Sequence, residues 1–247
     1  MVANTLKALL LAAGKATRLG ELSRSTPKCL LSVGEEVILD RIIRQLSNVG
    51  VTEFLINTHH LAEKVIEHIE ARHDRDRFTL VHESTLLGTL GTLRENLEFF
   101  SEGYGWVMHA DNFITGSLEP LERGFLQRPE GTWGGMLTFR AENPSNCGVV
   151  ETTADGVVTG FWEKPDRPPT REASAATFIF GKPVFEVAGS LPPSLNDISA
   201  DLLPRLIRRM VAVPHEGRVI DIGTPTGLRT ARSVATQSQR ASGSGNL

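Results

Sequence analysis

The chain has 247 residues, a formal charge of −3, 40% hydrophobic residues and two cysteines. This length suits a single sizeable core, and the scattered cations exclude the basic stripe of a nucleic-acid binder. Cys29 and Cys147 form neither a metal-ligand spacing nor a disulfide framework. No stretch reaches the ~20 apolar residues of a membrane span, and residues 1–11 lack a signal-peptide layout. We therefore expect a cytoplasmic protein that binds neither nucleic acid nor membrane.

The first informative stretch is an apolar run at residues 6–11, followed by three small residues at 12–14. The run is short enough for a buried strand, and small residues let backbone N–H groups approach a ligand. Lys15, Arg18 and Lys28 favour an anion, and phosphate is the natural candidate. An ordinary strand with a solvated charged loop fits as well, because glycine-rich phosphate loops are weak signals in isolation.

Helix-length and strand-length segments then alternate. Apolar residues at helical spacing predict helices at 38–46 and 61–69, and short apolar runs predict strands at 53–57, 78–82, 105–109 and 133–139. This alternation is typical of βαβ units. We therefore expect an α/β fold with a mostly parallel central sheet and helices on both faces, with ligands at the carboxyl ends of the strands.

The pattern changes beyond residue 140. Short apolar runs at 149–151, 157–163 and 175–180 are separated by turns, which predicts a small β-rich region built on hairpins. A helix is expected over 199–210 with Ser199 as its N-cap. Residues 233–247 are polar and Ser-rich, and we expect them to form a disordered tail.

Residues 11–19, LAAGKATRL, and 27–30, PKCL, resemble the signature L-A-A-G-x-G-T-R-L…P-K-x-L of the sugar-phosphate nucleotidyltransferases. Later segments follow the family in order, with EKP at 163–165 and DIGTP at 221–225. Single-domain mannose or heptose 1-phosphate guanylyltransferases are the most similar in motif. Ala16 replaces the second glycine of the signature, and its methyl group is expected to fit there without a positive φ.

The resemblance implies a fold, a reaction and a cofactor. The fold is a Rossmann-like nucleotidyltransferase domain over 1–232, with a nucleotide-binding half at 6–140 and a sugar-phosphate-binding half at 141–232. The reaction joins an NTP to a sugar 1-phosphate and releases pyrophosphate, and the cofactor is Mg²⁺. A homo-oligomer is compatible with the family.

Glu83, followed by Leu87-Gly88-Thr89, resembles the E-x-x-x-L-G-T pattern with which the family recognises the base. A carboxylate can accept hydrogen bonds from the N1–H and the 2-amino group of guanine. This favours GTP. Without the resemblance, the glycines would simply mark the start of a helix.

Two aspartates are candidates for the metal. Asp111 follows the strand at 105–109, and Asp221 ends a strand before a glycine turn. Carboxylate oxygens suit Mg²⁺, although each residue alone could be structural. The family has a Gly-Asp pair where this chain has Ala110-Asp111. His109 with Asp111 could suggest zinc, but no third ligand is evident.

The resemblance assigns the remaining roles residue by residue. Arg18 would hold the leaving pyrophosphate, Lys28 the reacting phosphates and Lys164 the attacking phosphate, and with Asp111 these are the expected catalytic residues. The expected nucleotide contacts are Leu11, Ala12, Ala13, Gly14, Lys15, Thr17, Arg18, Lys28, Glu83, Gly88, Thr89 and Asp111. The expected sugar-phosphate contacts are Asn112, Gly148, Glu163, Lys164 and Thr177, and the expected metal ligands are Asp111 and Asp221.

Two alternatives stay open. The nearer one is a nucleotidyltransferase of the same fold that uses UTP, dTTP or CTP in place of GTP, or a different acceptor such as a cyclitol phosphate, phosphocholine or a cofactor precursor. The departures at Ala16, Ala110 and Ala176 keep the different acceptor open. A non-catalytic subunit that binds a nucleotide sugar is the more distant alternative. The retained cations and aspartates argue against it.

Overall fold

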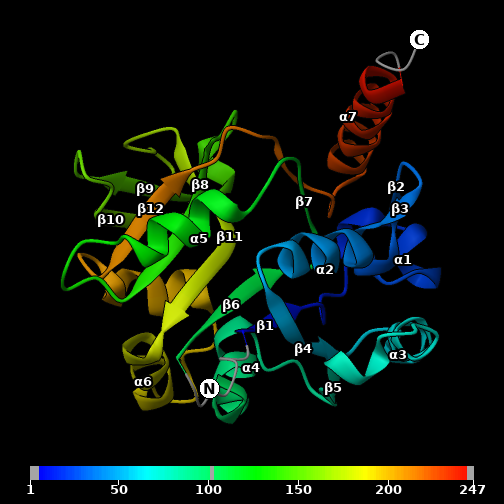
Figure 1. The fold of residues 1–247 in the computed structure, drawn as a ribbon, viewed down its shortest axis with the longest axis horizontal. Helices are drawn as coiled ribbons and strands as arrows, with labels where there is room; N and C mark the ends of the chain where they lie inside the picture. Colours follow the sequence, from blue (N-terminus) through cyan, green and yellow to red (C-terminus); the bar gives the residue numbers. More distant parts are fainter. Residues whose placement is uncertain (1–5, 101–102, 244–247) are drawn as a thin grey trace.

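The computed structural model describes residues 6–100 and 103–243. Its nine-stranded sheet is built around β1 (Leu6–Leu11), which pairs in parallel with β6 (Tyr104–His109) and β4 (Val51–Thr58). The strand β5 (Phe78–His82) continues the parallel order to one edge (Figure 1). The predicted α/β class with a mainly parallel centre is confirmed.

The other side of the sheet is mixed. The long strand β11 (Glu172–Gly181) runs antiparallel to β6 and also pairs with β8 (Gly134–Arg140) and β9 (Gly148–Thr152). The strand β10 (Val158–Glu163) pairs with β9, and β12 (Met210–Pro214) pairs in parallel with β8. The strand β8 therefore lies between β11 and β12.

Both faces of the sheet are buried. Successive residues of β1 point to opposite faces, so Ala8 and Leu10 belong to one apolar cluster and Leu9 to the other. Helices cover each cluster. The first is covered by α2 (Ile38–Asn48), α3 (Ala62–Glu70) and α5 (Glu119–Leu126), and the second by α4 (Thr89–Glu95) and α6 (Lys182–Ser190).

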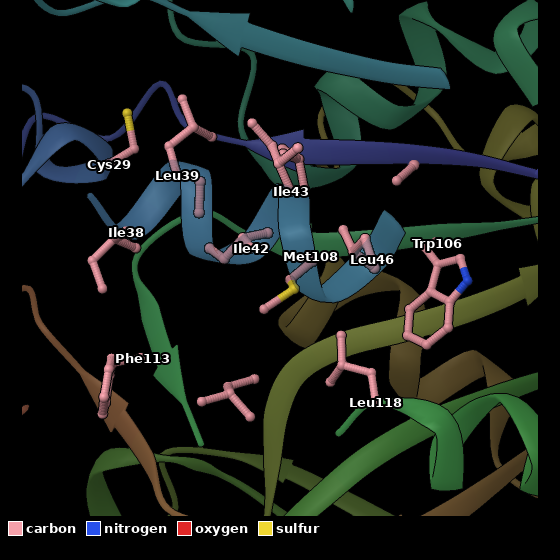
Figure 2. Packing of buried hydrophobic residues seen from close by; sticks show 14 of the residues in the cluster. Cys29, Ile38, Leu39, Ile42, Ile43, Leu46, Trp106, Met108, Phe113 and Leu118 are labelled. Carbon is pink, nitrogen blue, oxygen red and sulfur yellow. The ribbon is translucent and has the colours of Figure 1, made fainter. Parts of the chain in front are cut away.

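The packing of α2 shows why the helical spacing was informative. Ile38, Leu39, Ile42, Ile43 and Leu46 are at most 1% exposed. In Figure 2 Leu39 and Ile43 point from α2 toward β1, and Ile42 and Leu46 lie close to Met108 of β6. Burial of such side chains contributes about 1.5–3 kcal/mol each. This cluster holds the carboxyl ends of β1 and β6 in place.

Two small ribbons complete the fold. One pairs β2 (Ser32–Val33) with β3 (Glu36–Val37), and the other pairs β7 (Asn112–Ile114) antiparallel with β13 (Val219–Asp221). Short helical segments link the larger elements: α1 (Leu22–Ser25), 3-10 turns at Thr17–Leu19, Lys28–Leu30, Arg75–Arg77, Leu97–Phe100, Pro144–Asn146 and Leu203–Leu206, and a π-helical turn at Ile198–Leu202. No helix among the described residues is long and apolar enough to cross a bilayer.

Two segments differ from the sequence predictions. The final helix α7 (Pro225–Gly243) continues through most of the expected disordered tail, and residues 244–247 lie outside the described residues. It starts on Pro225, and its first turns are held by the buried side chains of Leu228 and Ala231. Val234 and Ala235, within the expected disordered tail, are partly buried against the same core cluster.

The predicted helix at 199–210 is wrong in its cap and its length. Asp197, not Ser199, is the N-cap, because its side chain accepts a hydrogen bond from the Ala200 N–H at 2.8 Å. Pro204 has no N–H to donate, and Arg208 has a φ of +63°. The segment is therefore one π turn and one 3-10 turn before β12 begins.

Candidate active site

The β7–β13 ribbon brings together two carboxylates that lie far apart in the sequence. The register pairs Asp221 with Asn112, and the Ile222 N–H donates to the Asp111 carbonyl oxygen at 3.1 Å. Asp111 lies two residues beyond the end of β6, so both carboxylates lie at the carboxyl edge of the sheet. This is the edge at which parallel sheets bind ligands.

Lys28 lies between these two carboxylates. Its ammonium donates to Asp111 Oδ2 and, at 2.8 Å, to Asp221 Oδ1, and the residue is only 8% exposed. Arg18 Nη2 donates to Asp221 Oδ2 at 3.2 Å. We call these four residues, Arg18, Lys28, Asp111 and Asp221, the charge cluster. Two carboxylates converge in it on one cation, which is the donor set that a divalent metal also uses.

Asp221 stays ionised in this environment. Burial raises its pKa, but the charge and hydrogen bond of Lys28, the Gly223 N–H at 2.7 Å and the charge of Arg18 outweigh burial and hold the pKa below its ordinary value. Gly223 also leaves room for the lysine, because a Cβ there would lie 2.1 Å from Lys28 Nζ. The glycine of the DIGTP motif is therefore required by the cluster itself.

A cavity of about 260 Å³ opens beside the charge cluster. It collects most of the predicted nucleotide contacts: Leu11, Ala12, Ala13, Gly14, Lys28, Glu83, Gly88, Thr89 and Asp111. Lys15 and Thr17 are not in its lining, and Arg18 lines a neighbouring cavity instead. Asn57 and Thr92 also line it and were not predicted. The position of Asn57 at the carboxyl end of a parallel strand was the signal that could have indicated it.

Glu83 is 4% exposed and is held by three donors. Its Oε1 accepts from Asn57 Nδ2 at 2.8 Å and from Thr92 Oγ1 at 2.5 Å, and its Oε2 accepts from the Leu87 N–H at 3.0 Å. Gly88 then turns the chain into α4 at a φ of +77°. A Cβ at Gly88 would lie 2.4 Å from the Asn196 carbonyl oxygen, so the glycine of the L-G-T pattern is required by the fold.

A second cavity, of about 240 Å³, adjoins the first and shares His109 and Asp111 with it. The predicted residues Asn112, Gly148 and Glu163 line it, together with unpredicted polar residues: Asn146, Ser174 and Ser199. Among the described residues no group of three or more His, Cys, Asp and Glu side chains could hold a metal ion.

Two predicted acceptor contacts lie outside this lining. Lys164 is next to it, largely exposed, with its ammonium 2.9 Å from Glu163 Oε1. Thr177 is fully buried in β11, and its hydroxyl donates to the Ala175 carbonyl oxygen at 3.2 Å. Thr177 is therefore buried away from the cavity, which its predecessors Ala175 and Ala176 line.

Two of the three alanines that replace family glycines have left-handed backbone conformations. Ala16 has a φ of +51° and Ala176 a φ of +47°. The expectation that Ala16 would avoid a positive φ is wrong. The loop conformation is imposed by the surrounding chain, and alanine adopts it at a cost of about 1–2 kcal/mol.

Comparison with known proteins identifies the family. The family model described as nucleotidyl transferase matches residues 7–238. The chain belongs to this family.

Relatives of this family member include a mannose-1-phosphate guanylyltransferase catalytic subunit beta of Drosophila pseudoobscura pseudoobscura, 27% identical over 245 residues. That match covers 97% of this chain but 65% of the relative, so the chain spans slightly less than two thirds of that protein. The UTP–glucose-1-phosphate uridylyltransferase AglF of Haloferax volcanii is 27% identical, over 89% of this chain and 92% of its own. A crystal structure of a putative glucose-1-phosphate thymidylyltransferase from Bacillus anthracis, in complex with a sucrose, has the same fold, with a TM-score of 0.80 at 21% identity over 94% of this chain and 95% of that chain.

Proposed function

We propose that the protein transfers a nucleotidyl group from an NTP to a sugar 1-phosphate, giving an NDP-sugar and pyrophosphate. The observation that carries this proposal is the charge cluster at the junction of two cavities. One cavity has a small-residue phosphate loop and buried polar groups for a nucleotide, and the other has polar groups for a hydroxylated acceptor. The printed names of the relatives describe reactions of this class.

The chemistry needs positioning and charge neutralisation more than proton transfer. An oxygen of the sugar phosphate attacks the α-phosphorus, and the bond to the β-phosphate oxygen breaks as pyrophosphate leaves. No general base is needed, because a phosphate monoester is already ionised near pH 7. In this proposal Lys28 contacts the reacting phosphates, Arg18 the leaving pyrophosphate and Lys164 the attacking phosphate. Their charges bring two anions together.

The charge cluster also suits Mg²⁺. Asp111 and Asp221 already share one cation, the ammonium of Lys28. Magnesium is commonly held by one or two carboxylates and by substrate phosphates. We propose that these two residues hold Mg²⁺, which would neutralise phosphate charge when bound. Lys28 would then be released to the substrate phosphates.

GTP is the favoured nucleotide in this proposal, and UTP and dTTP are alternatives. GTP is supported by the relatives named as guanylyltransferases. Mannose or glucose 1-phosphate is the first acceptor to test, because the relatives' names contain both. Ala176, with its methyl group at a family glycine position, is a reason to include other phosphorylated acceptors.

The test is a matrix of reactions followed by pyrophosphate release. The protein is mixed with Mg²⁺, each of GTP, UTP, dTTP, CTP and ATP, and each of several sugar 1-phosphates, a cyclitol phosphate and phosphocholine. We expect pyrophosphate only where an NTP and a sugar 1-phosphate are both present. If none of these substrate pairs gives pyrophosphate, but a nucleotide sugar binds tightly, the protein is instead a non-catalytic binding protein.

A further inference from the structure

The orientation of the Asn57 amide can be assigned from its partners. The backbone N–H of Ala12 is a donor only, and it lies 2.7 Å from one terminal atom of Asn57. That atom must therefore be the carbonyl Oδ1, which leaves the NH₂ group to face Glu83 Oε1 at 2.8 Å and Thr92 Oγ1 at 3.1 Å. Asn57 is 3% exposed, so it has little freedom to turn. It links the phosphate loop to the carboxylate of the nucleotide cavity.

The bonds of Glu83 can then be counted. A carboxylate offers about four acceptor positions. Asn57 and Thr92 use two of them on Oε1, and the Leu87 N–H uses one on Oε2. One position on Oε2 is left for a ligand, and Glu83 lines the cavity. The carboxylate can thus take a single N–H, not the pair that guanine would offer.

We propose that Asn57 is a positioning residue for base selection, an inference that rests on the proposed function. By donating to Glu83, it keeps the carboxylate an acceptor and admits bases whose central pairing-edge nitrogen carries a hydrogen. Guanine has N1–H there, and uracil and thymine have N3–H. Adenine N1 and cytosine N3 present a lone pair, which would face the lone pairs of Glu83 and leave a buried acceptor unpaired. The site therefore takes GTP, UTP and dTTP and rejects ATP and CTP.

The first test compares two nucleotides of equal size. UTP and CTP differ only in the pairing edge, and their dissociation constants are measured by isothermal titration calorimetry. A buried acceptor left unpaired reduces affinity substantially, so UTP should bind at least about tenfold more tightly than CTP. GTP should likewise bind more tightly than ATP. Equal affinity for UTP and CTP would overturn the proposal, whether or not the protein catalyses pyrophosphate release.

The second test changes Asn57 alone. In the Asn57→Asp variant the Ala12 N–H keeps an acceptor, but Glu83 faces a second carboxylate. Two such groups share a proton, which reduces the negative charge of Glu83 and weakens it as an acceptor for the base. The preference for UTP over CTP should fall severalfold toward equality. An unchanged preference in a variant with the wild-type circular dichroism spectrum would refute the role of Asn57.

Thr92→Val is the matched control. It removes one donor from Glu83 without adding an acceptor, so affinities for both nucleotides can change while their ratio is kept. If Asn57→Asp does not fold, the comparison of UTP with CTP in the wild type still decides whether Glu83 acts as an acceptor toward the base. Because binding is measured separately from pyrophosphate release, selective binding without turnover would contradict the proposed function and leave this inference standing. Pyrophosphate release without any preference between UTP and CTP would support the proposed function and contradict this inference.

Discussion

Lys28 is the buried cation on which both carboxylates of the charge cluster converge. With 8% of its surface exposed, it depends on Asp111 and Asp221 to offset the cost of burying its charge. The carboxylates depend on it equally, because without it they would repel each other. Phosphates and a metal would compete for the same groups. The ion pairs of the charge cluster can therefore be exchanged for contacts with substrate phosphates and a metal.

The Lys28→Met variant tests this dependence. It keeps the length of the side chain but removes the charge, so the two carboxylates lose their shared cation. We expect turnover to fall by about 10²-fold or more, on the scale of lost electrostatic stabilisation elsewhere. We also expect Mg²⁺ to raise the Tm of the variant more than that of the wild type. An equal rise in both proteins would show that Lys28 and the metal do not share these carboxylates.

Acid stability tests the ionisation of Asp221. Its pKa is lower in the folded protein than its ordinary value of 3.8. The folded state therefore binds fewer protons than the unfolded state in that range. The stabilisation is present above this value and is lost as the pH falls through the folded pKa.

The matched comparison for Asp221 is Asp221→Asn, followed by thermal unfolding at several pH values. The difference in Tm between wild type and variant should be constant from about pH 7 to 5 and should shrink below about pH 4. A difference that already shrinks between pH 7 and 5 would contradict the depressed pKa.

The β7–β13 ribbon and the turn after it determine how the carboxylates meet. Gly223 and Gly227 flank this turn into α7, and each is close to Asp221. A Cβ at Gly223 would meet the end of a flexible side chain, Lys28 Nζ at 2.1 Å. A Cβ at Gly227 would meet backbone, the Asp221 carbonyl oxygen at 2.0 Å. The same substitution should therefore have different consequences at the two positions.

We expect Gly223→Ala to lower turnover by tenfold or more with only a small change in Tm. Lys28 can move aside, but its ammonium then loses its carboxylate partners. Each of these charged hydrogen bonds is worth about 1.5–3 kcal/mol. Gly227→Ala should lower the Tm clearly, because backbone must shift. Thermal unfolding and pyrophosphate release of the two variants, measured side by side, check the contrast. A reversed order would show that the turn does not position the cluster.

Elements with a regular pattern were predictable from the sequence, and irregular ones were not. The helical spacing of Ile38 to Leu46 and the apolar run of β1 correspond to real elements because each buries what its pattern shows. The left-handed conformation of Ala16 was missed because alanine rarely adopts it. The apolar spacing at 199–210 predicted one regular helix, but Pro204 interrupts it. The segment is instead a π turn at Ile198–Leu202 followed by a 3-10 turn at Leu203–Leu206.

For the molecule as a whole, motif order indicated the reaction class but not which side chains meet. The charge cluster joins residues from the first loop, from the end of β6 and from β13, and only the folded chain shows that Lys28 lies between the two aspartates. Asn57 and Thr92 carried no motif, yet they hold Glu83. Thr177 matched a family position but is buried away from the cavity. Contacts between distant segments account for each of these differences.

The central claim is that the bond broken lies between the α- and β-phosphates, at the charge cluster. The most direct measurement follows the phosphorus of GTP labelled with ³²P at the α or the γ position, incubated with Mg²⁺, mannose 1-phosphate and either wild type or Asp111→Asn. We predict that wild type places the α label in a sugar nucleotide and the γ label in pyrophosphate, and that the variant does neither at an appreciable rate. A γ label transferred to the acceptor, an α label released as GMP, or an unimpaired Asp111→Asn variant would contradict the account.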